Sequence, residues 1–194
     1  MIALVKRLIW RMVDIFVFLT ALIRNPREMG AILPSSSRLA EEMVSHISMH
    51  GNDMVVDLGA GTGVVTLALI KAGIDPAKII AIECSSSLSK KLQKRFPLIQ
   101  VINGDAVDLS CLLGDKKSLV NTIVSGIPLR SLHQSVSQAI LQQISNILPL
   151  GGRYIQFTYQ YKQNLIFSPV CFKQTFSKII WQNMPPARVD VFEI

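Results

Sequence analysis

The sequence predicts an α/β fold: one domain with a seven-stranded, mostly parallel sheet and an antiparallel C-terminal hairpin. Past Pro26, short apolar runs alternate with helical stretches, which is the rhythm of β-α-β units. A glycine-rich loop over residues 59–63 follows the first of these runs and opens a helical stretch. Near the C-terminus, two strand-like segments are separated by little more than Pro185-Pro186, too short a connection for parallel neighbours.

The elements follow from these patterns in chain order. Compact runs of β-branched and aliphatic residues predict strands, and longer polar-apolar stretches between them predict helices. Gly151-Gly152 is expected to be the turn into the fifth strand. The predicted strands cover residues 53–58, 78–83, 98–102, 119–125 and 153–158, followed by the hairpin strands 176–182 and 188–194. The predicted helices cover residues 63–72, 85–95 and 131–147, with a weak one at 109–113.

Residues 1–25 are predicted to form an amphipathic helix ahead of a domain at 26–194. Apolar residues recur there at helical spacing from Val5 to Ile23, with arginines on the opposite side. The uninterrupted apolar run 15–23 is shorter than the roughly 20 residues that span a bilayer, and no A-x-A-like cleavage motif follows it. Three interpretations stay open: a helix packed on the domain, a helix lying in a membrane interface, or a secretion signal.

Composition narrows the class of partner. The 194 residues carry a net charge of +7, which favours anionic partners such as nucleic acid or an anionic membrane without separating the two. Cys84, Cys111 and Cys171 are widely spaced and form no ligand pattern with the three histidines. We therefore expect no disulfide framework and no metal site, three ordinary thiols in or near the core, and a reducing cytosol.

The loop Asp57-Leu58-Gly59-Ala60-Gly61-Thr62-Gly63 is predicted to bind a cofactor. Gly59 permits a tight turn, Gly61 lets the backbone approach a ligand, and Gly63 relieves crowding where the helix starts. A dinucleotide fingerprint has a longer last glycine interval. The leading acid would oppose a pyrophosphate but favour a cationic ligand.

Two further acids follow at predicted strand ends. Glu83 closes the second strand, where its carboxylate could accept both hydroxyls of a ribose. Asp105, after the third strand, could accept an exocyclic adenine amine. The acids and the glycine loop thus stand at the carboxyl ends of neighbouring predicted strands, and this arrangement predicts a nucleoside-binding site.

These residues resemble the class I S-adenosylmethionine-dependent methyltransferases over roughly residues 53–125. The resemblance implies a Rossmann-like fold and S-adenosyl-L-methionine as cofactor, whose cationic sulfonium and ammonium suit nearby acids. It implies cofactor contacts from Asp57, Gly59, Ala60, Gly61, Thr62, Gly63, Glu83, Cys84, Gly104, Asp105, Ala106 and Ser125.

The segment Ser125-Gly126-Ile127-Pro128-Leu129 is the expected acceptor loop. Amino methyltransferases that act on nucleic-acid bases carry N-P-P-Y or N-L-P-Y here, with an aromatic residue that stacks on the flipped base. Ser125 replaces the amide and Leu129 the aromatic residue, which disfavours a base as substrate.

Nearly end to end, the chain is similar to the bacterial phospholipid N-methyltransferases, which convert phosphatidylethanolamine to phosphatidylcholine. The matching segments include residues 30–36, the glycine loop, the acceptor loop, 149–159 and 183–187. The chain departs from that family at 189–193, where tyrosines would be expected. The phospholipid N-methyltransferases are themselves similar to the ribosomal RNA adenine dimethylases.

Apart from the resemblance, the loop Ser125-Gly126-Ile127-Pro128 is expected to hold the amine through its carbonyls, and Tyr159 and Tyr161 could face a methylated ammonium through cation–π contact. Ordinary strand-end packing is the alternative for both tyrosines. A two-chain lipid substrate would bring the enzyme to the membrane, so we expect it to be peripheral to the inner membrane on its cytoplasmic side, with the N-terminal helix as the means of attachment. An RNA adenine N6-methyltransferase and a non-catalytic cofactor-binding or membrane-associated module stay as rival hypotheses.

Overall fold

The structure, a computed structural model, describes residues 37–129, 132–159, 172–183 and 186–194. All of these residues belong to one compact unit, Ser35–Ile194. The helix predicted over residues 1–25 lies outside the described residues, and so does Tyr161. The proposed boundary between a leading helix and a domain at 26–194 therefore stays a prediction.

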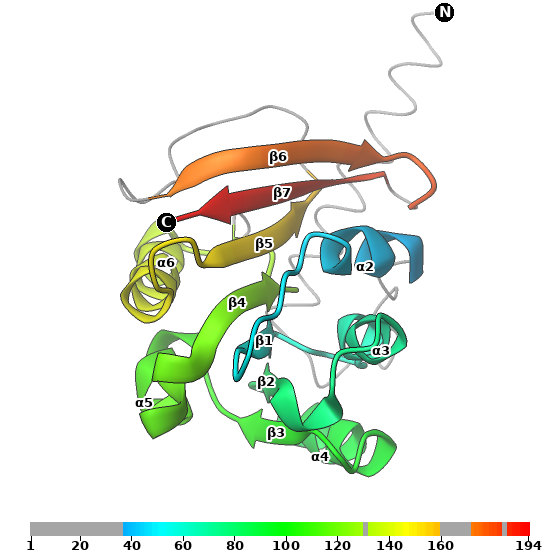
Figure 1. Ribbon diagram of the computed structural model, residues 1–194, viewed down its shortest axis with the longest axis vertical. Coiled ribbons are helices and arrows are strands. Elements are labelled where there is room, and N and C mark those ends of the chain that lie inside the picture. Colours follow the sequence, from blue (N-terminus) through cyan, green and yellow to red (C-terminus); the bar gives the residue numbers. More distant parts are fainter. Residues whose placement is uncertain (1–36, 130–131, 160–171, 184–185) are drawn as a thin grey trace, which may run out of the picture. The chain divides into compact units, whose positions relative to one another are not determined.

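Seven strands form one sheet in the order β3-β2-β1-β4-β5-β7-β6 (Figure 1). β7 pairs antiparallel with both β5 and β6, and all other neighbours pair parallel, which confirms the predicted mixed sheet and edge hairpin. The strands are β1 (Met54–Leu58), β2 (Ile79–Glu83), β3 (Gln100–Asn103), β4 (Val120–Ser125), β5 (Arg153–Thr158), β6 (Lys173–Ile180) and β7 (Ala187–Glu193).

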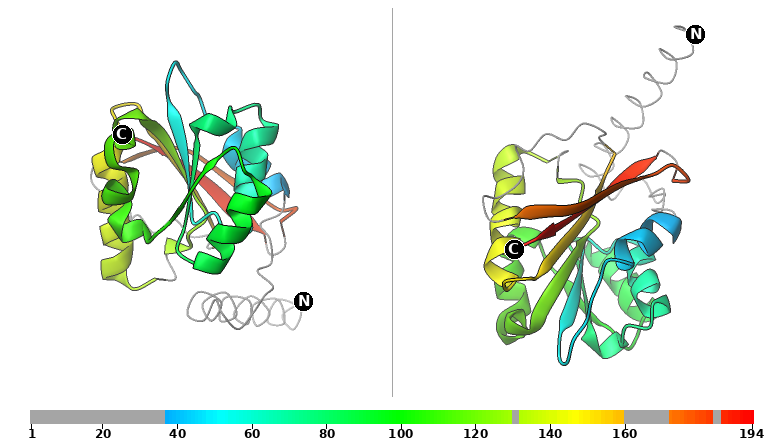
Figure 2. Two further views of the ribbon diagram at one scale, coloured as in Figure 1. Left: turned by 90° about the horizontal axis from the view of Figure 1, so that it is seen from below. Right: turned by 45° about the horizontal axis from the view of Figure 1, so that its top comes forward.

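Helices cover both faces of the sheet (Figure 2). One buried cluster joins α2, α3 and α4 to alternate strand residues such as Val55 and Ile155, and a second joins α5 and α6 to the intervening residues such as Val56 and Tyr154. The helices are α2 (Ser37–Val44), α3 (Val64–Lys71), α4 (Ser86–Arg95), α5 (Leu109–Leu113) and α6 (Gln134–Ile147). Short 3-10 turns cover η1 (Pro76–Lys78), η2 (Ala106–Asp108) and η3 (Gly114–Leu119).

Several boundaries differ from the sequence prediction by one to three residues. β6 begins at Lys173 rather than 176, because pairing with Glu193 of β7 extends a segment too polar to read as a strand. β3 covers 100–103 rather than 98–102. α6 begins at Gln134 rather than 131, with the exposed His133 at its N-cap position.

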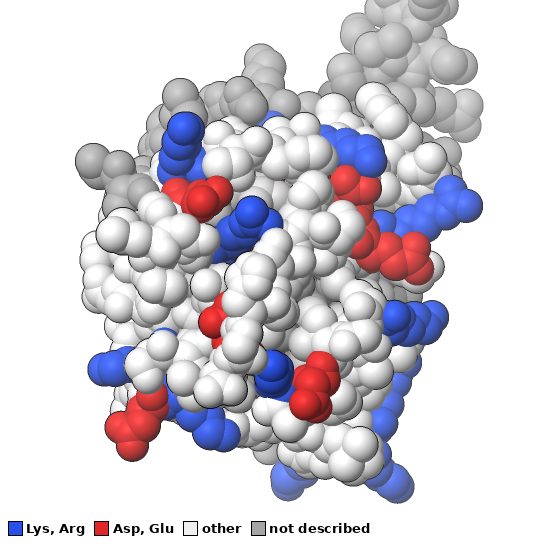
Figure 3. Space-filling model, viewed as in Figure 1, with Lys and Arg blue, Asp and Glu red and all other residues white. Residues whose placement is uncertain are grey.

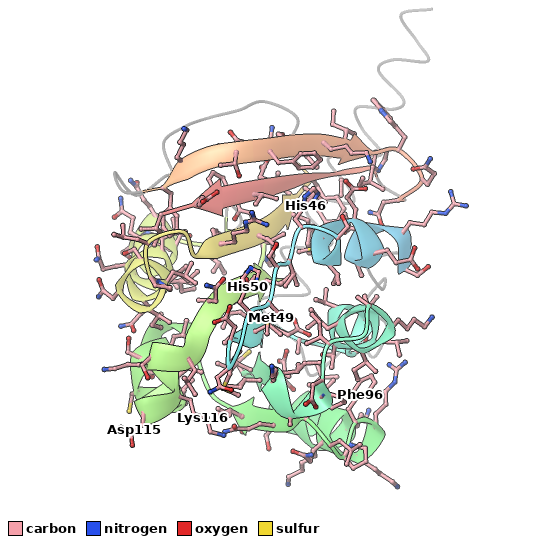
Figure 4. The ribbon with its side chains drawn as sticks, in the orientation of Figure 1. His46, Met49, His50, Phe96, Asp115 and Lys116 are labelled. Carbon is pink, nitrogen blue, oxygen red and sulfur yellow. The ribbon has the colours of Figure 1, made fainter. Side chains whose placement is uncertain are left out.

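The cysteine prediction is corrected for two of the three thiols. Cys84 and Cys111 are free and exposed rather than in the core, because one follows the end of β2 and the other lies on the outer face of α5. His46 and His50 lie between α2 and β1 (Figure 4). Within the described ranges, no group of three or more His, Cys, Asp or Glu side chains could hold a metal ion. Nor does that part of the chain contain a helix with the length and apolarity to cross a bilayer.

Candidate active site

The glycine loop turns sharply at the carboxyl end of β1 and is tied to β2. The N–H groups of Gly59 and Ala60 both donate to the Ile82 carbonyl, at 2.9 and 3.1 Å. Gly59, Gly61 and Gly63 have φ of 75°, 54° and 83°, in the left-handed region that residues with a side chain rarely adopt. The loop conformation therefore requires these glycines.

The three glycines of the loop differ in how much free space surrounds the position where a side chain would be. A Cβ on Gly59 would lie 2.6 Å from the Ile127 side chain, and one on Gly63 would lie 2.6 Å from Phe96, which Figure 4 labels below α3. These two positions are closed by the protein itself. A Cβ on Gly61 would meet nothing nearer than the Gly59 carbonyl at 3.9 Å. Gly61 is thus the loop glycine with open space beside its backbone, and its contact with a ligand stays a prediction.

Asp57 is fully buried at the end of β1, beneath the loop. Its Oδ2 accepts a hydrogen bond of 2.5 Å from the Thr66 hydroxyl, in the first turn of α3. Among the residues that the structure describes, its Oδ1 has no hydrogen-bond partner. Desolvation raises the pKa of Asp57 to about 7, opposed by the Thr66 bonds and assisted by the nearby Glu83 charge. A buried acid with an unpaired oxygen favours a cationic ligand.

Glu83, 6% exposed at the end of β2, clamps the loop. One carboxylate oxygen accepts the Gly61 N–H at 2.8 Å, and the other accepts the Ser85 N–H at 2.8 Å. Each carboxylate oxygen can accept two hydrogen bonds. Oε1 also accepts one from the Cys84 thiol at 3.6 Å, so Oε2 is the oxygen that retains a site for a ribose hydroxyl. The predicted ribose contact stays a prediction with a geometry that permits it.

The chain after β3 completes this edge. Asn103 donates to the Glu83 and Cys84 carbonyls at 2.8 and 3.1 Å, joining the ends of β3 and β2. The exposed Asp105 caps η2 by accepting the Val107 N–H at 3.1 Å. The pKa of Cys84 is raised by desolvation and by the Glu83 carboxylate, so its thiol is not an activated nucleophile. Gly104 and the buried Ala106 flank Asp105.

We call the loop 57–63, Glu83 and the segment 103–106 the donor side. Three of its carboxylates, from Asp57, Glu83 and Asp105, stand at the carboxyl ends of β1, β2 and β3, with an open backbone position at Gly61 between them. The exposed Thr62, whose carbonyl accepts a 2.7 Å bond from Arg95, closes the loop toward α4. The arrangement fits a cationic nucleoside, whose hydroxyls and amines need acceptors.

The acceptor loop 125–129 packs directly on the glycine loop. The Gly126 N–H donates to the Leu58 carbonyl at 2.8 Å, and a Cβ on Gly126 would lie 2.7 Å from the Gly59 carbonyl. The partly exposed Ile127 fills the space beside Gly59. Leu129 is 4% exposed, in the core beneath α6. Its side chain cannot stack on a base.

Ser125 is fully buried at the end of β4, on the same face of the strand as Ile123 of the second cluster. Its hydroxyl accepts the Ile127 N–H at 3.2 Å and bonds the hydroxyl of Tyr154, which in turn donates to Gln156 at 2.9 Å. Burial raises the pKa of Tyr154, and the Asp190 charge adds to that rise. The Ser125 side chain therefore anchors the loop to β5, and any contact of Ser125 with a ligand would be made by its backbone.

This anchor continues across the edge hairpin. Arg188 forms a two-pronged ion pair with Asp190 at 2.8–3.0 Å, and both side chains are at most 5% exposed. Gln174 and Ser177 of β6 also donate to Asp190, at 3.0 and 2.7 Å. A buried charge pair of this kind requires such extra hydrogen bonds.

Tyr159 follows β5, but on the other face. Its ring meets Phe157 edge to face at 5.5 Å and packs with the cluster beneath α2 and α3. Its hydroxyl bonds the Asn183 side chain, and desolvation raises its pKa. The structure thus brings Ser125, Gly126, Ile127 and the partly exposed Pro128 together at the loop, while the Tyr159 side chain packs apart from that of Ser125. We call the loop 125–129 together with Tyr154 the acceptor side, and a role for Tyr159 there stays a prediction.

Several residues of the site escaped the sequence analysis. Thr66 is the one hydroxyl in the first turns of an apolar helix, which is a usable signal. Asn103 adjoins the recognised Asp105 and could have been included with it. The contacts of Tyr154, Arg188 and Asp190 depend on strand register across β5, β7 and β6, which no local pattern encodes.

Comparison with known proteins agrees with this site. Residues 55–152, about half of the chain, match the family described as a methyltransferase domain. The chain is 27% identical to the ornithine lipid N-methyltransferase of Singulisphaera acidiphila, over 91% of this chain and 94% of that one. It is 36% identical to the ribosomal RNA small subunit methyltransferase A of Thermotoga neapolitana, but only over 38% of this chain and 27% of that one.

Solved structures agree on the fold. TrmN from Thermus thermophilus superposes with a TM-score of 0.68 at 18% identity, over 81% of this chain and 48% of that one. This chain therefore spans about half the length of TrmN. The glycopeptide N-methyltransferase MtfA, solved with S-adenosyl-L-homocysteine, superposes with a TM-score of 0.54 at 18% identity, over 77% of this chain and 58% of that one.

The predicted sheet, the glycine loop beside three strand-end acids and the match over residues 55–152 all point to the same chemistry. Relatives of the same fold have been solved with the methyl donor and with its demethylated product. The chain therefore belongs to the family of methyltransferase domains, as an enzyme whose methyl donor is S-adenosylmethionine.

Proposed function

We propose that the enzyme methylates the headgroup amine of a membrane lipid, converting phosphatidylethanolamine stepwise towards phosphatidylcholine. The observation that carries this proposal is the nearly full-length relation to an ornithine lipid N-methyltransferase, at 27% identity over 91% of the chain. Both lipids present a primary amine on a two-chain apolar body. The lipid class is thus supported by the relative, and phosphatidylethanolamine by the sequence resemblance.

The acceptor loop suits an amine that needs alignment more than activation. The Ile127 carbonyl already accepts the Leu129 N–H at 2.9 Å, and the Leu129 carbonyl accepts the Ser137 hydroxyl at 2.6 Å. No hydrogen bond between described residues uses the Gly126 or Pro128 carbonyl, so these are the carbonyls that we assign to an amine N–H. Bound S-adenosylmethionine supplies an activated methyl group, and the loop's task is to hold the nitrogen in line with it.

No strong general base stands in the acceptor loop. His133, the nearest histidine past it along the chain, is exposed, and its ring is hydrogen-bonded to the Ser135 hydroxyl at 2.8 Å. An ethanolamine nitrogen is nucleophilic once it has lost its proton, and water at the bilayer surface can take that proton. The absence of a base from the loop is therefore compatible with an amine acceptor.

RNA adenine is the second candidate, because the ribosomal RNA methyltransferase relative matches the chain, though over only 38% of its length. The +7 charge would also serve phosphate binding. Lys and Arg side chains gather along the edge where α3 and α4 lie (Figure 3), among them the exposed Lys90, Lys91 and Lys94 of α4. The buried Leu129 weighs against this candidate, since the loop lacks a ring to stack on a flipped base.

Mass spectrometry of lipids and RNA tests the choice. The purified chain would be given S-adenosylmethionine together with phosphatidylethanolamine, an ornithine lipid or ribosomal RNA, with Gly61→Val protein as the inactive control. We expect mono-, di- or trimethylated lipid and no methylated RNA. Methylated adenine without methylated lipid would establish the RNA candidate. Tight donor binding without turnover on any amine would instead establish a non-catalytic module.

We also propose that the enzyme acts at the cytoplasmic surface of the inner membrane. Moving a two-chain lipid out of its bilayer costs about 0.8 kcal/mol of free energy for each CH₂ group exposed to water, so the enzyme has to reach the lipid in the membrane. The amphipathic pattern of residues 1–25 is the proposed anchor. Deleting residues 2–23 should lower activity on vesicles far more than activity on a short-chain soluble lipid. Equal losses on the two substrates would make this segment structural.

A further inference from the structure

The turn between β6 and β7 lies at the same edge of the sheet as the active site. Thr158 of β5 pairs with Arg188 of β7, which pairs with Ile179 of β6. β6 therefore runs parallel to β5, as their arrowheads in Figure 1 show, and it ends at the edge that carries the glycine and acceptor loops. The residues that follow β6 thus emerge beside the active site.

Trp181, the first residue after β6, exposes 69% of its surface at this edge. No charged residue occurs from Ile179 to Ala187. Exposed turns between strands are ordinarily rich in Gly, Asn, Asp and Ser. A large exposed aromatic side chain in an uncharged turn is instead typical of the boundary between water and the lipid headgroups, where Trp is enriched.

The described start of this turn, residues 181–183, is tied to the end of β5. The buried side chain of Asn183 bonds the Tyr159 hydroxyl at the end of β5. Trp181 and the acceptor loop follow β6 and β4, which stand three strand spacings apart in the sheet, about 14 Å. A flat surface that contacts Trp181 would therefore lie near the acceptor loop.

The charge of the whole protein favours an anionic surface as the partner. The protein carries a net charge of +7, which attracts it to anionic lipid over a distance of about a Debye length. Lys178, 54% exposed on β6, is ion-paired with Glu42 of α2 at 2.8 Å, so the immediate surroundings of Trp181 are not acidic on balance. Long-range attraction by the whole protein and short-range contact by Trp181 would act together.

We propose that Trp181 docks the carboxyl edge of the sheet on an anionic lipid bilayer, so that the active site faces the headgroups, an inference that rests on the lipid acceptor proposed above. Trp181 lies in the methyltransferase unit itself. This contact is therefore separate from any contact made by residues 1–25, and it sets the orientation of the active site.

Tryptophan fluorescence tests the contact directly, because the chain has only two tryptophans, Trp10 and Trp181. In the Trp10→Phe protein, all tryptophan emission comes from Trp181. With vesicles of phosphatidylethanolamine and phosphatidylglycerol, we expect this emission to move to shorter wavelength and to be quenched by brominated acyl chains. Trp181→Ala should weaken vesicle binding about tenfold while donor binding by calorimetry stays unchanged.

A matched control uses the opposite edge of the sheet. Leu150 is 90% exposed just before β5, so a Leu150→Trp substitution in a Trp10→Phe, Trp181→Phe background reports on that edge. Its emission should stay that of a water-exposed ring when vesicles are added. Equal quenching of the two reporters would overturn the proposal, as would unchanged Trp181 emission in protein that cosediments with vesicles, or no binding to vesicles.

The docking and the proposed function can fail separately. Lipid methylation in detergent micelles requires no bilayer, so it reports on the acceptor alone. Quenched Trp181 emission without any methylated lipid would sustain the docking and overturn the lipid acceptor. Methylated lipid in micelles, together with Trp181 emission that does not change when vesicles are added, would sustain the lipid acceptor and overturn the docking.

Discussion

The donor side of the active site is held mainly by hydrogen bonds between side chains and backbone groups close to the strand ends, whereas the acceptor side is joined to β5 by hydrogen bonds between side chains of β4 and β5. On the donor side, Glu83 accepts the Gly61 and Ser85 N–H groups and Asn103 donates to two carbonyls. On the acceptor side, Ser125, Tyr154 and Gln156 bond one another in sequence.

This difference separates what each side tolerates. Backbone partners are present whatever the neighbouring residues are, so the donor side depends on a few acids and glycines. Side-chain partners exist only if each residue of the set is kept. We therefore expect substitutions on the donor side to change donor affinity, and those on the acceptor side to change turnover at unchanged donor affinity.

The largest expected effect is loss of donor binding in Gly61→Val. Gly61 has a φ of 54° and lies open to the ligand, so a valine there strains the backbone and occupies the ligand's space. Calorimetry should detect no donor binding, while circular dichroism shows a folded protein. Gly51→Val is the control, because Gly51 has a φ of 49°, open surroundings and a position far from the loop. Donor binding by Gly61→Val would place the ligand elsewhere.

The second effect is a pH dependence of stability caused by Asp57, whose pKa rises from 3.8 to about 7 on folding. The folded protein keeps a proton that the unfolded chain releases, so this contribution to stability is complete below about pH 4 and is lost as the pH rises through about 7. The difference is on the order of 4 kcal/mol. Asp57→Asn should remove it.

Melting temperatures measured from about pH 5 to about pH 8 test this prediction. The wild-type protein should lose stability relative to Asp57→Asn as the pH rises, because the variant has no proton to lose at this position. The variant should also bind the cationic donor more weakly. Parallel melting curves for the two proteins would contradict the assigned pKa.

The third effect is a loss of about 1.5–3 kcal/mol in donor affinity for Glu83→Ala, the scale of a hydrogen bond to a charged group. The structure adds that Gly61 loses its acceptor too, so the loop should become more mobile. Calorimetry measures the donor affinity, and the rate of amide hydrogen exchange at Gly61 measures the mobility of the loop. Unchanged affinity would mean that the ribose lies away from Glu83.

The smallest effect tests the acceptor side. Tyr154→Phe keeps the ring between Phe172 and Phe192 but removes the hydroxyl that joins Ser125 to Gln156. We expect turnover to fall about tenfold with donor affinity unchanged, since a lost buried hydrogen bond costs about 1–3 kcal/mol. Phe192→Leu, which removes a ring contact but no hydrogen bond, should lower stability and leave turnover alone. Reduced donor affinity in Tyr154→Phe would end the distinction between the two sides.

The same contrast explains which parts could be predicted from the sequence. The sheet, its hairpin and the donor side follow from local patterns, because a strand, a glycine turn and a strand-end acid each occupy a few consecutive residues. Asp57, Gly61 and Glu83 were found this way, and the structure places all three at one edge.

The acceptor side depended on pairings that sequence spacing does not reveal. Tyr154 reads as a strand residue, and only the register of β5 against β7 brings it near Asp190. The Ser125 side chain is buried on the face of β4 that also carries Ile123 of the second cluster, and its contact with Tyr154 could not be read from the sequence. The role of Ser125 at the ligand stays a prediction. The role of Tyr159 at the acceptor stays a prediction.

The backbone contact between Gly59 and Gly126 constrains how this enzyme can change its substrate. The backbones of the two loops are in direct contact at these glycines: a Cβ added at Gly126 would lie only 2.7 Å from the Gly59 carbonyl oxygen. An enlarged residue at either position would push the methyl source and the recipient out of alignment together. Substitutions that adapt the enzyme to another methyl acceptor therefore have to keep Gly59 and Gly126, and they are expected at position 127 and the residues after it.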